Sequence, residues 1–201
     1  MSIRITVLGI ATFALATLAT SAHANAHDWS GTEVIAHVSG DLPFKDSPFG
    51  LRVHATRFMI PSKDVSLSFF YVGPTWTGQA GGFSLWVSPQ FATSLGFLTS
   101  DAFGPALWSQ LDYAGKANLF MDLEHYSGLH GGNAWYGLYS GNWTPASWFN
   151  LGAQAEHVDL GLHVGPHVGM TVGPFHGEVQ YYYGAINDTA NALRLVTALR
   201  F

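Results

Sequence analysis

The sequence predicts an all-β protein that folds as a single antiparallel up-and-down β-barrel of about ten strands. From Leu51 onward, segments of about ten residues alternate apolar with small or polar side chains, and turn-forming residues separate them. That region carries no sustained stripe of apolar residues at helical spacing, and no run in it approaches 18 consecutive apolar residues. We therefore expect strands rather than helices throughout it.

The composition points to the same fold class. Only 10% of the 201 residues are charged, whereas about 25% is usual in soluble domains, and aromatic residues reach 14%. The formal charge of −5 offers no basic surface to phosphates, so no nucleic acid is expected as a partner. The absence of cysteine excludes disulfides and thiolate metal ligands.

The first residues are typical of a secretory signal peptide. Met1–Ala24 contains Arg4, an apolar stretch from Ile5 to Ala19, and Ala22-His23-Ala24 as a cleavage signal. An uncleaved anchor is the alternative, but the apolar stretch is shorter than the roughly 20 residues of a membrane-spanning helix. We expect residues 1–24 to be removed, residues 25–50 to form an irregular segment with a short strand at Glu33–Val38, and residues 51–201 to form the barrel domain.

Ten strands are predicted between the turn residues. They cover Leu51–Ile60, Val65–Val72, Phe83–Phe97, Phe103–Tyr113, Ala117–Ser127, Asn133–Ser140, Ser147–His157, Asp159–Met170, Phe175–Ile186 and Ala190–Phe201. The pattern is weakest in Phe103–Tyr113, so a barrel of eight strands is an alternative.

The two faces of the predicted strands differ in a way that favours a membrane. In Asp159–Met170 one face is apolar from Leu160 to Met170, and the other consists of glycine and histidine. A soluble barrel exposes many charged side chains, but the polar face here has few of them. Such a face suits a narrow lumen, with the apolar face turned toward lipid, which makes the predicted fold a transmembrane barrel.

The end of the chain resembles a known family. Alternating apolar residues from Leu193 lead to a terminal aromatic residue, Phe201. This pattern resembles the last strand of Gram-negative outer-membrane β-barrels, in which it serves as the assembly signal. The resemblance implies an outer-membrane barrel that has lipids and the barrel-assembly machinery as partners. It also implies that Leu195, Leu199 and Phe201 carry the signal. We expect the protein to be a monomer.

A cluster of polar residues is predicted inside the lumen. Its members lie on the polar faces of the last four strands, and they are Glu156, His163, His167, Glu178, Tyr182 and Arg194. A two-residue turn at Val172-Gly173 would place His167 opposite Glu178 and His163 opposite Tyr182. A turn at residues 187–189 would place Arg194 beside Tyr182.

Two interpretations of this cluster are open. Imidazole and carboxylate groups could form a proton-linked or metal-linked site. They could instead form a hydrogen-bonded network that fills the lumen. His163 and His167 are four strand residues apart, about 13 Å, too far to share one ion. The network is favoured, and neither a metal nor a cofactor is expected.

His125 and Ser127 are a second candidate site. They share the apolar face of their strand, roughly 6–7 Å apart, where an imidazole can activate a hydroxyl. The pair resembles the His-x-Ser pair of outer-membrane lipid A deacylases, which implies a lipid hydrolase. The alternative is two polar side chains at the membrane rim.

Three functions follow from these observations. The leading prediction is a non-enzymatic outer-membrane barrel with a structural role or a narrow, porin-like passage for small solutes or ions. The second is the lipid hydrolase that uses His125 and Ser127. The third is a soluble periplasmic, lipocalin-like barrel that encloses a hydrophobic ligand.

Overall fold

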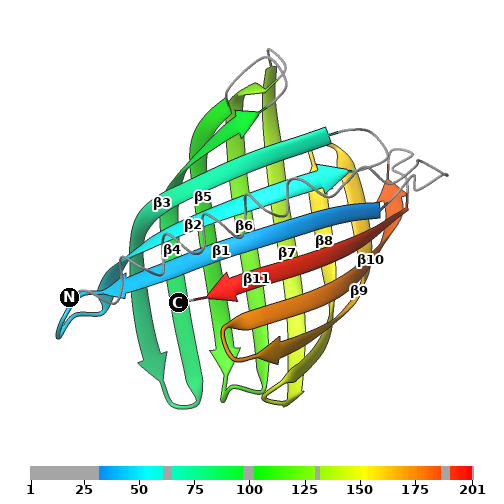
Figure 1. Cartoon of the computed structure of the whole chain (residues 1–201). Coiled ribbons are helices and arrows are strands. Elements are labelled where there is room, and N and C mark those ends of the chain that lie inside the picture. The colour runs from blue at the N-terminus through cyan, green and yellow to red at the C-terminus, as the bar shows by residue number, and fades with distance from the viewer. Residues whose placement is uncertain (1–31, 61–64, 97–101, 130–131, 187–190, 201) are drawn as a thin grey trace.

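The described residues form a closed all-β barrel (Figure 1). A computed structural model describes residues 32–60, 65–96, 102–129, 132–186 and 191–200. Eleven strands are present in these segments: β1 (Thr32–Pro43), β2 (Phe49–Ile60), β3 (Val65–Ala80), β4 (Phe83–Gly96), β5 (Ala102–Tyr113), β6 (Ala117–Leu129), β7 (Gly132–Ala146), β8 (Phe149–Val158), β9 (Gly161–Val172), β10 (Phe175–Ile186) and β11 (Ala192–Arg200). The predicted signal peptide lies outside the described residues.

The predicted fold class is confirmed, but the strand count is wrong. The weakest predicted strand forms β5, so the eight-stranded alternative is excluded. The short strand expected at Glu33–Val38 is present, but it is longer than predicted because β1 covers Thr32–Pro43, and β2 begins at Phe49, so the segment is less irregular than expected. Asp41 and Pro43 resemble turn residues in the sequence, yet Asp41 pairs with Arg52 and extends the β1–β2 hairpin.

Strand β1 closes the barrel. It pairs antiparallel with β2 on one side and parallel with β11 on the other, where Val34 is the partner of Leu195. Figure 1 shows β1 in blue lying directly beside β11 in red. With eleven strands in an up-and-down order, the first and the last strand must run in the same direction. All other neighbouring strands are antiparallel and consecutive in sequence.

Two strands run further than predicted because proline is accommodated inside them. Strand β3 continues through Gly73-Pro74 to Ala80. A Cβ at Gly73 would overlap the carbonyl oxygen of Pro89, so only glycine allows the two strands to approach there. Strand β7 continues to Ala146, and an irregular register between Trp143 and Ala146 absorbs Pro145.

The β9–β10 hairpin turns at Gly173-Pro174, one residue later than predicted. Gly173 has a φ of 59°, which glycine adopts without strain, and Val172 pairs with Phe175. The register therefore shifts by two residues. His167 is opposite Gln180, not Glu178, and His163 is opposite Gly184, not Tyr182.

The two faces of the barrel differ as predicted. On the outer face one register row crosses β8, β9, β10, β11 and β1 through Leu151, Val168, Val179, Leu195 and Val34. On the inner face the buried residues include Gln90, Glu124 and Arg194. Among the described residues, no helix is long and apolar enough to span a membrane.

Glycines on the inner face provide the space that large polar side chains occupy. A Cβ at Gly152 would come within 2.5 Å of the His167 ring, and one at Gly169 would meet Asn150 and His176. Small and large residues thus alternate across neighbouring strands, which fills the narrow lumen. A buried cluster of Tyr71, Trp108 and Tyr126 with three alanines forms the apolar part of the interior.

Candidate functional site

Arg194 is the centre of one polar network in the lumen. Its Nε donates to Glu33 Oε2 at 2.6 Å, and its two terminal nitrogens donate to the Glu156 carboxylate at 2.8 and 3.1 Å. It also donates to the Tyr182 hydroxyl at 2.9 Å, and its guanidinium lies 4.5 Å from the centre of that ring. We call Glu33, Glu156, Tyr182 and Arg194 the arginine cluster. It ties together strands β1, β8, β10 and β11.

Three of the six predicted lumen residues therefore meet in the arginine cluster. The predicted contact between Arg194 and Tyr182 exists, although the Cα partner of Arg194 on β10 is Gln180. Glu33 was missed because the short strand expected at Glu33–Val38 was not counted as part of the barrel, which was expected to begin at residue 51. The alternation of residues in Glu33–Val38 was the signal that could have placed Glu33 on the inner face.

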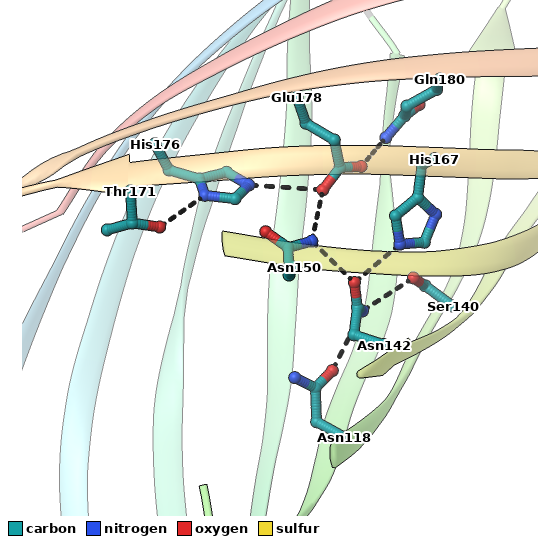
Figure 2. Close-up of polar contacts among 9 residues, drawn as sticks. All are labelled: Asn118, Ser140, Asn142, Asn150, His167, Thr171, His176, Glu178 and Gln180. Atoms are coloured by element: carbon teal, nitrogen blue, oxygen red, sulfur yellow. Dashed lines mark hydrogen bonds and ion pairs between the residues drawn. The ribbon is translucent and has the colours of Figure 1, made fainter. Parts of the chain in front are cut away.

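Glu178 and His167 belong to a second network, which Figure 2 shows. Glu178 accepts hydrogen bonds from Gln180 at 2.6 Å and from Asn150 at 3.5 Å, and its carboxylate is 3.3 Å from His176 Nε2. The members of this amide–histidine network are Asn118, Ser140, Asn142, Asn150, His167, Thr171, His176, Glu178 and Gln180.

His167 reaches Glu178 only through two amides. Its Nε2 is 2.6 Å from Asn142 Oδ1, and Asn150 bridges Asn142 to Glu178. No described ion pair joins Glu178 to Arg194, whose carboxylate partners are Glu33 and Glu156. The single cluster predicted from the sequence is thus divided between two networks.

His163 lies at the edge of the arginine cluster. It is the Cα partner of Glu156, and its ring meets the Tyr182 ring edge-on with the centres 6.0 Å apart. Its buried Nδ1 has no hydrogen-bond partner among the described residues. His163 therefore packs against the arginine cluster without a hydrogen bond to it.

A buried pair of carboxyl groups was not singled out from the sequence. Asp122 and Glu124 are neighbours on the inner face of β6, with 7% and 4% of their surface exposed. Tyr71 donates to Glu124 Oε2 at 3.3 Å, and its hydroxyl is 3.0 Å from that of Tyr126. The signal was the alternation of Asp122 and Glu124 with Met121 and Leu123. We call Asp122 and Glu124 the acid pair.

A further set of polar side chains, those of His37, His54 and Thr56, links β1 to β2 inside the lumen. His37 Nδ1 and His54 Nε2 lie 3.2 Å apart, and each is within 2.8 Å of Thr56 Oγ1. The His54 ring packs edge-on against Trp108 and Tyr71. In the part of the chain that the structure describes, no three His, Cys, Asp or Glu residues converge closely enough to hold a metal ion.

His125 and Ser127 lie on the outer face of β6, as predicted. The His125 ring packs against Trp135, with the ring centres 4.5 Å apart. Ser127 is the Cα partner of Phe103 and of Asn133. Among the described residues, no hydrogen bond joins His125 to Ser127 and no carboxylate orients the imidazole. Lipid hydrolysis by this pair stays a prediction of the sequence.

The residues expected to carry the assembly signal are only partly described. Leu195 points outward on β11 with 40% of its surface exposed, and Leu199 follows it on the same face. Phe201 lies outside the described residues. No protein-family model, no curated protein and no solved structure matches this chain.

Proposed function

We propose that this chain is an integral outer-membrane β-barrel whose filled lumen serves a structural role or restricts passage to small solutes and ions. The observation that carries the proposal is the polarity of the barrel. Large apolar side chains are exposed on the outside, including Val168, Val179 and Leu195, while the buried inner face holds carboxylates, amides and Arg194. An apolar exterior around a polar interior is the arrangement that a lipid surrounding favours.

Aromatic rings near both ends of the barrel support the same proposal. At the end with the β3–β4 and β5–β6 turns, the rings of Phe83 and Tyr113 pack 4.9 Å apart on the outer face. Toward the other end, Trp135 packs against His125, and Phe103 lies on the outer face at the beginning of β5. Amphipathic rings at both boundaries are typical of the two membrane interfaces.

The polar networks favour a restricted lumen over a wide pore. The arginine cluster connects β8 to β11 across the interior, and the amide–histidine network fills the space beside β7, β8, β9 and β10. Side chains just fill the interior of a barrel of about eight strands. In this wider barrel of eleven strands, long polar side chains that bond to one another across the interior occupy part of the space. A lipocalin-like binder would need an apolar lumen, so the polar lining also argues against that alternative.

Cell fractionation combined with a gel assay tests the proposal. The full-length chain is expressed in a Gram-negative host, and outer membranes are separated from the periplasmic fraction. We expect the protein in the outer membrane, with a gel mobility in detergent that changes after boiling because the barrel stays folded in the unheated sample. Recovery in the periplasmic fraction without a change of mobility would contradict the proposal and favour the soluble alternative.

A further inference from the structure

Arg57 is a charged residue on the apolar outer face of the barrel. The preceding residue, Thr56, lies in the lumen beside His37, so Arg57 is on the opposite face of β2, as is Val53, which is 43% exposed. All other Asp, Glu, Lys and Arg residues of the described strands alternate onto the inner face, and they are Glu33, Asp41, Arg52, Asp112, Asp122, Glu124, Glu156, Glu178, Arg194 and Arg200. A lone charge on a surface that faces lipid is destabilising unless it finds a partner.

Arg57 has no counter-charge among the described residues. Its Nη1 donates to Ser68 Oγ at 2.6 Å, and none of the described ion pairs includes it. No described hydrogen bond uses the opposite edge of the guanidinium, which carries Nε and Nη2. Arg52 binds the carboxylate of Asp41 through the same two nitrogens. This edge can donate two parallel hydrogen bonds to a carboxylate or a phosphate.

Two buried polar atoms without a partner lie at this position. Among the described residues, Arg57 Nε and Ser66 Oγ are the only buried side-chain atoms on the outer face that have no hydrogen-bond partner, and all other atoms of this kind belong to lumen side chains. Ser66 is on the same face as Ser68, which pairs with Arg57, so it is a diagonal neighbour that a long side chain can reach. Buried polar atoms are rarely left unpaired, so these two indicate a ligand that accepts hydrogen bonds.

The position of Arg57 along its strand places it near one boundary of the barrel. Arg57 is three residues before the end of β2, and Ser68 is three residues after the beginning of β3, the strand beside it in Figure 1. Three strand residues span about 10 Å. Arginine side chains on a lipid-facing surface extend toward the head groups. In an outer-membrane barrel the guanidinium can therefore reach the level of the lipid phosphates.

We propose that Arg57, Ser66 and Ser68 bind the phosphate group of a membrane lipid. The phosphate supplies the missing negative charge and accepts two hydrogen bonds from the free edge of the guanidinium. The two serine hydroxyls can donate to its other oxygens. The inference rests on the proposed function, because only a barrel embedded in a membrane presents this face to lipid head groups.

Lipid titration of the purified barrel tests the site. The protein is held in a non-ionic detergent, and binding of the first molecule of dimyristoyl phosphatidylglycerol is measured by native mass spectrometry. We expect Arg57→Gln to weaken this binding by about tenfold, because charge-assisted hydrogen bonds to the phosphate are lost. Dimyristoylglycerol has the same acyl chains without the phosphate, so it should bind equally to the parent and the variant. Equal affinity of both proteins for the phosphatidylglycerol would overturn the proposal.

Lys116→Gln is the matched control for the loss of charge. Lys116 is in the turn between β5 and β6, at the opposite end of the barrel from the end of β2. Its replacement removes the same charge, so the control should bind the lipid as the parent does. Equal weakening in both variants would reduce the effect to general attraction of anionic lipids and refute a site at Arg57.

A competition experiment separates a lipid phosphate from free phosphate. Inorganic phosphate is added to the complex of the parent barrel with phosphatidylglycerol. We expect the lipid to stay bound, because its acyl chains remain on the apolar outer face. Release of the lipid by an equal concentration of inorganic phosphate would overturn the assignment to a lipid.

Solid-state NMR of the unmodified chain makes the test independent of whether the variants fold. The barrel is labelled with ¹³C at the guanidinium carbon of arginine and reconstituted in bilayers that contain phosphatidylglycerol, where ¹³C–³¹P dephasing reports contact with phosphate. We expect dephasing of one guanidinium signal, which Arg57→Lys should remove, and its absence from every arginine would refute the proposal. A barrel in the outer membrane without this contact would overturn the inference alone, whereas recovery from the periplasm would contradict the proposed function.

Discussion

Arg194 shows how a single residue can organise the interior of this barrel. Its charge is balanced by Glu33 on β1 and Glu156 on β8, so the ion pairs cross the lumen as well as the β1–β11 boundary. Arginine suits this position because its planar guanidinium can bind one carboxylate with two hydrogen bonds and still donate a third to another group. Removal of one of its carboxylate partners should therefore lower the free energy of unfolding.

Replacing Glu156 with Gln should destabilise the barrel. The change leaves the buried Arg194 with Glu33 as its only carboxylate, and loss of one partner from a buried ion pair typically costs about 3–5 kcal/mol. We expect a loss of about 3 kcal/mol in the free energy of unfolding, measured with urea in detergent micelles. Asp41→Asn is the control, because Asp41 and Arg52 form an exposed pair for which at most about 1 kcal/mol is expected. Equal losses in the two variants would contradict a special role of the buried pair.

The sequence predicted individual lumen residues better than their contacts. The inner-face positions of Glu156, Tyr182 and Arg194 follow from the two-residue period of a strand. The contact between Arg194 and Tyr182 was predicted, but the contact between Arg194 and Glu156 was not, because these two residues are on strands that are not neighbours. The contact of Tyr71 on β3 with Glu124 on β6 could not be predicted for the same reason, because it crosses the interior between strands that are not neighbours.

At the scale of elements, β1 distinguishes the observed barrel from the predicted one. Glu33, Ile35 and His37 face inward and Val34, Ala36 and Val38 face outward, the same alternation as in the other strands. Its closing role could not be predicted, because no local pattern says that a first strand pairs in parallel with the last. The error in the β9–β10 register has a local cause, the choice between two adjacent turns around Gly173.

Cysteine cross-linking tests the parallel pairing of β1 with β11. The chain contains no cysteine, so Val34→Cys with Leu195→Cys introduces one defined pair. These residues are Cα partners, and neighbouring strands are about 4.8 Å apart, a spacing that a disulfide can bridge. We expect oxidation to give an internally cross-linked chain that migrates differently on a denaturing gel without reductant.

Val34→Cys with Leu199→Cys is the matched control for this experiment. Leu199 is on the same face of β11 but is paired with Val38, four residues further along the strand. The separation is then about 13 Å, so no cross-link should form within a folded monomer. A cross-link in the control pair but not in the first pair would show that the register, or the closure by β1, is different.

At the scale of the whole molecule, the apolar outer face predicts that a lysine there destabilises the barrel more near the middle of the membrane than near its surface. Val168 lies inside β9, four residues before Val172, which ends the strand and is 71% exposed. If lipid surrounds the barrel, Val168→Lys should reduce the free energy of folding into liposomes by about 2–4 kcal/mol, and Val172→Lys by at most about 1 kcal/mol. Equal and small effects of the two changes would favour water around the barrel.

The fold class could be predicted from the sequence because it depends on composition and alternation, which are summed over many residues. Few charges, no cysteine and a polar inner face all point to a closed barrel. The number of strands depends on a single segment, Thr32–Pro43, and for that reason it was wrong by one. The contacts of the acid pair could not be predicted from the sequence, because they depend on which side chains meet across the lumen after the barrel has closed.

The parallel closure restricts how the chain could be rearranged. Thr32 lies beside Leu193, whereas Arg200 lies beside Ser39, so the start of β1 and the end of β11 are about seven residues, or roughly 23 Å, apart along the strands. Barrels whose first and last strands are antiparallel bring these two points together, and a short loop can then join them in a circular permutant. Here a joining segment would have to run back along the barrel for at least about seven extended residues. A tight hairpin between β11 and β1 is therefore incompatible with this topology.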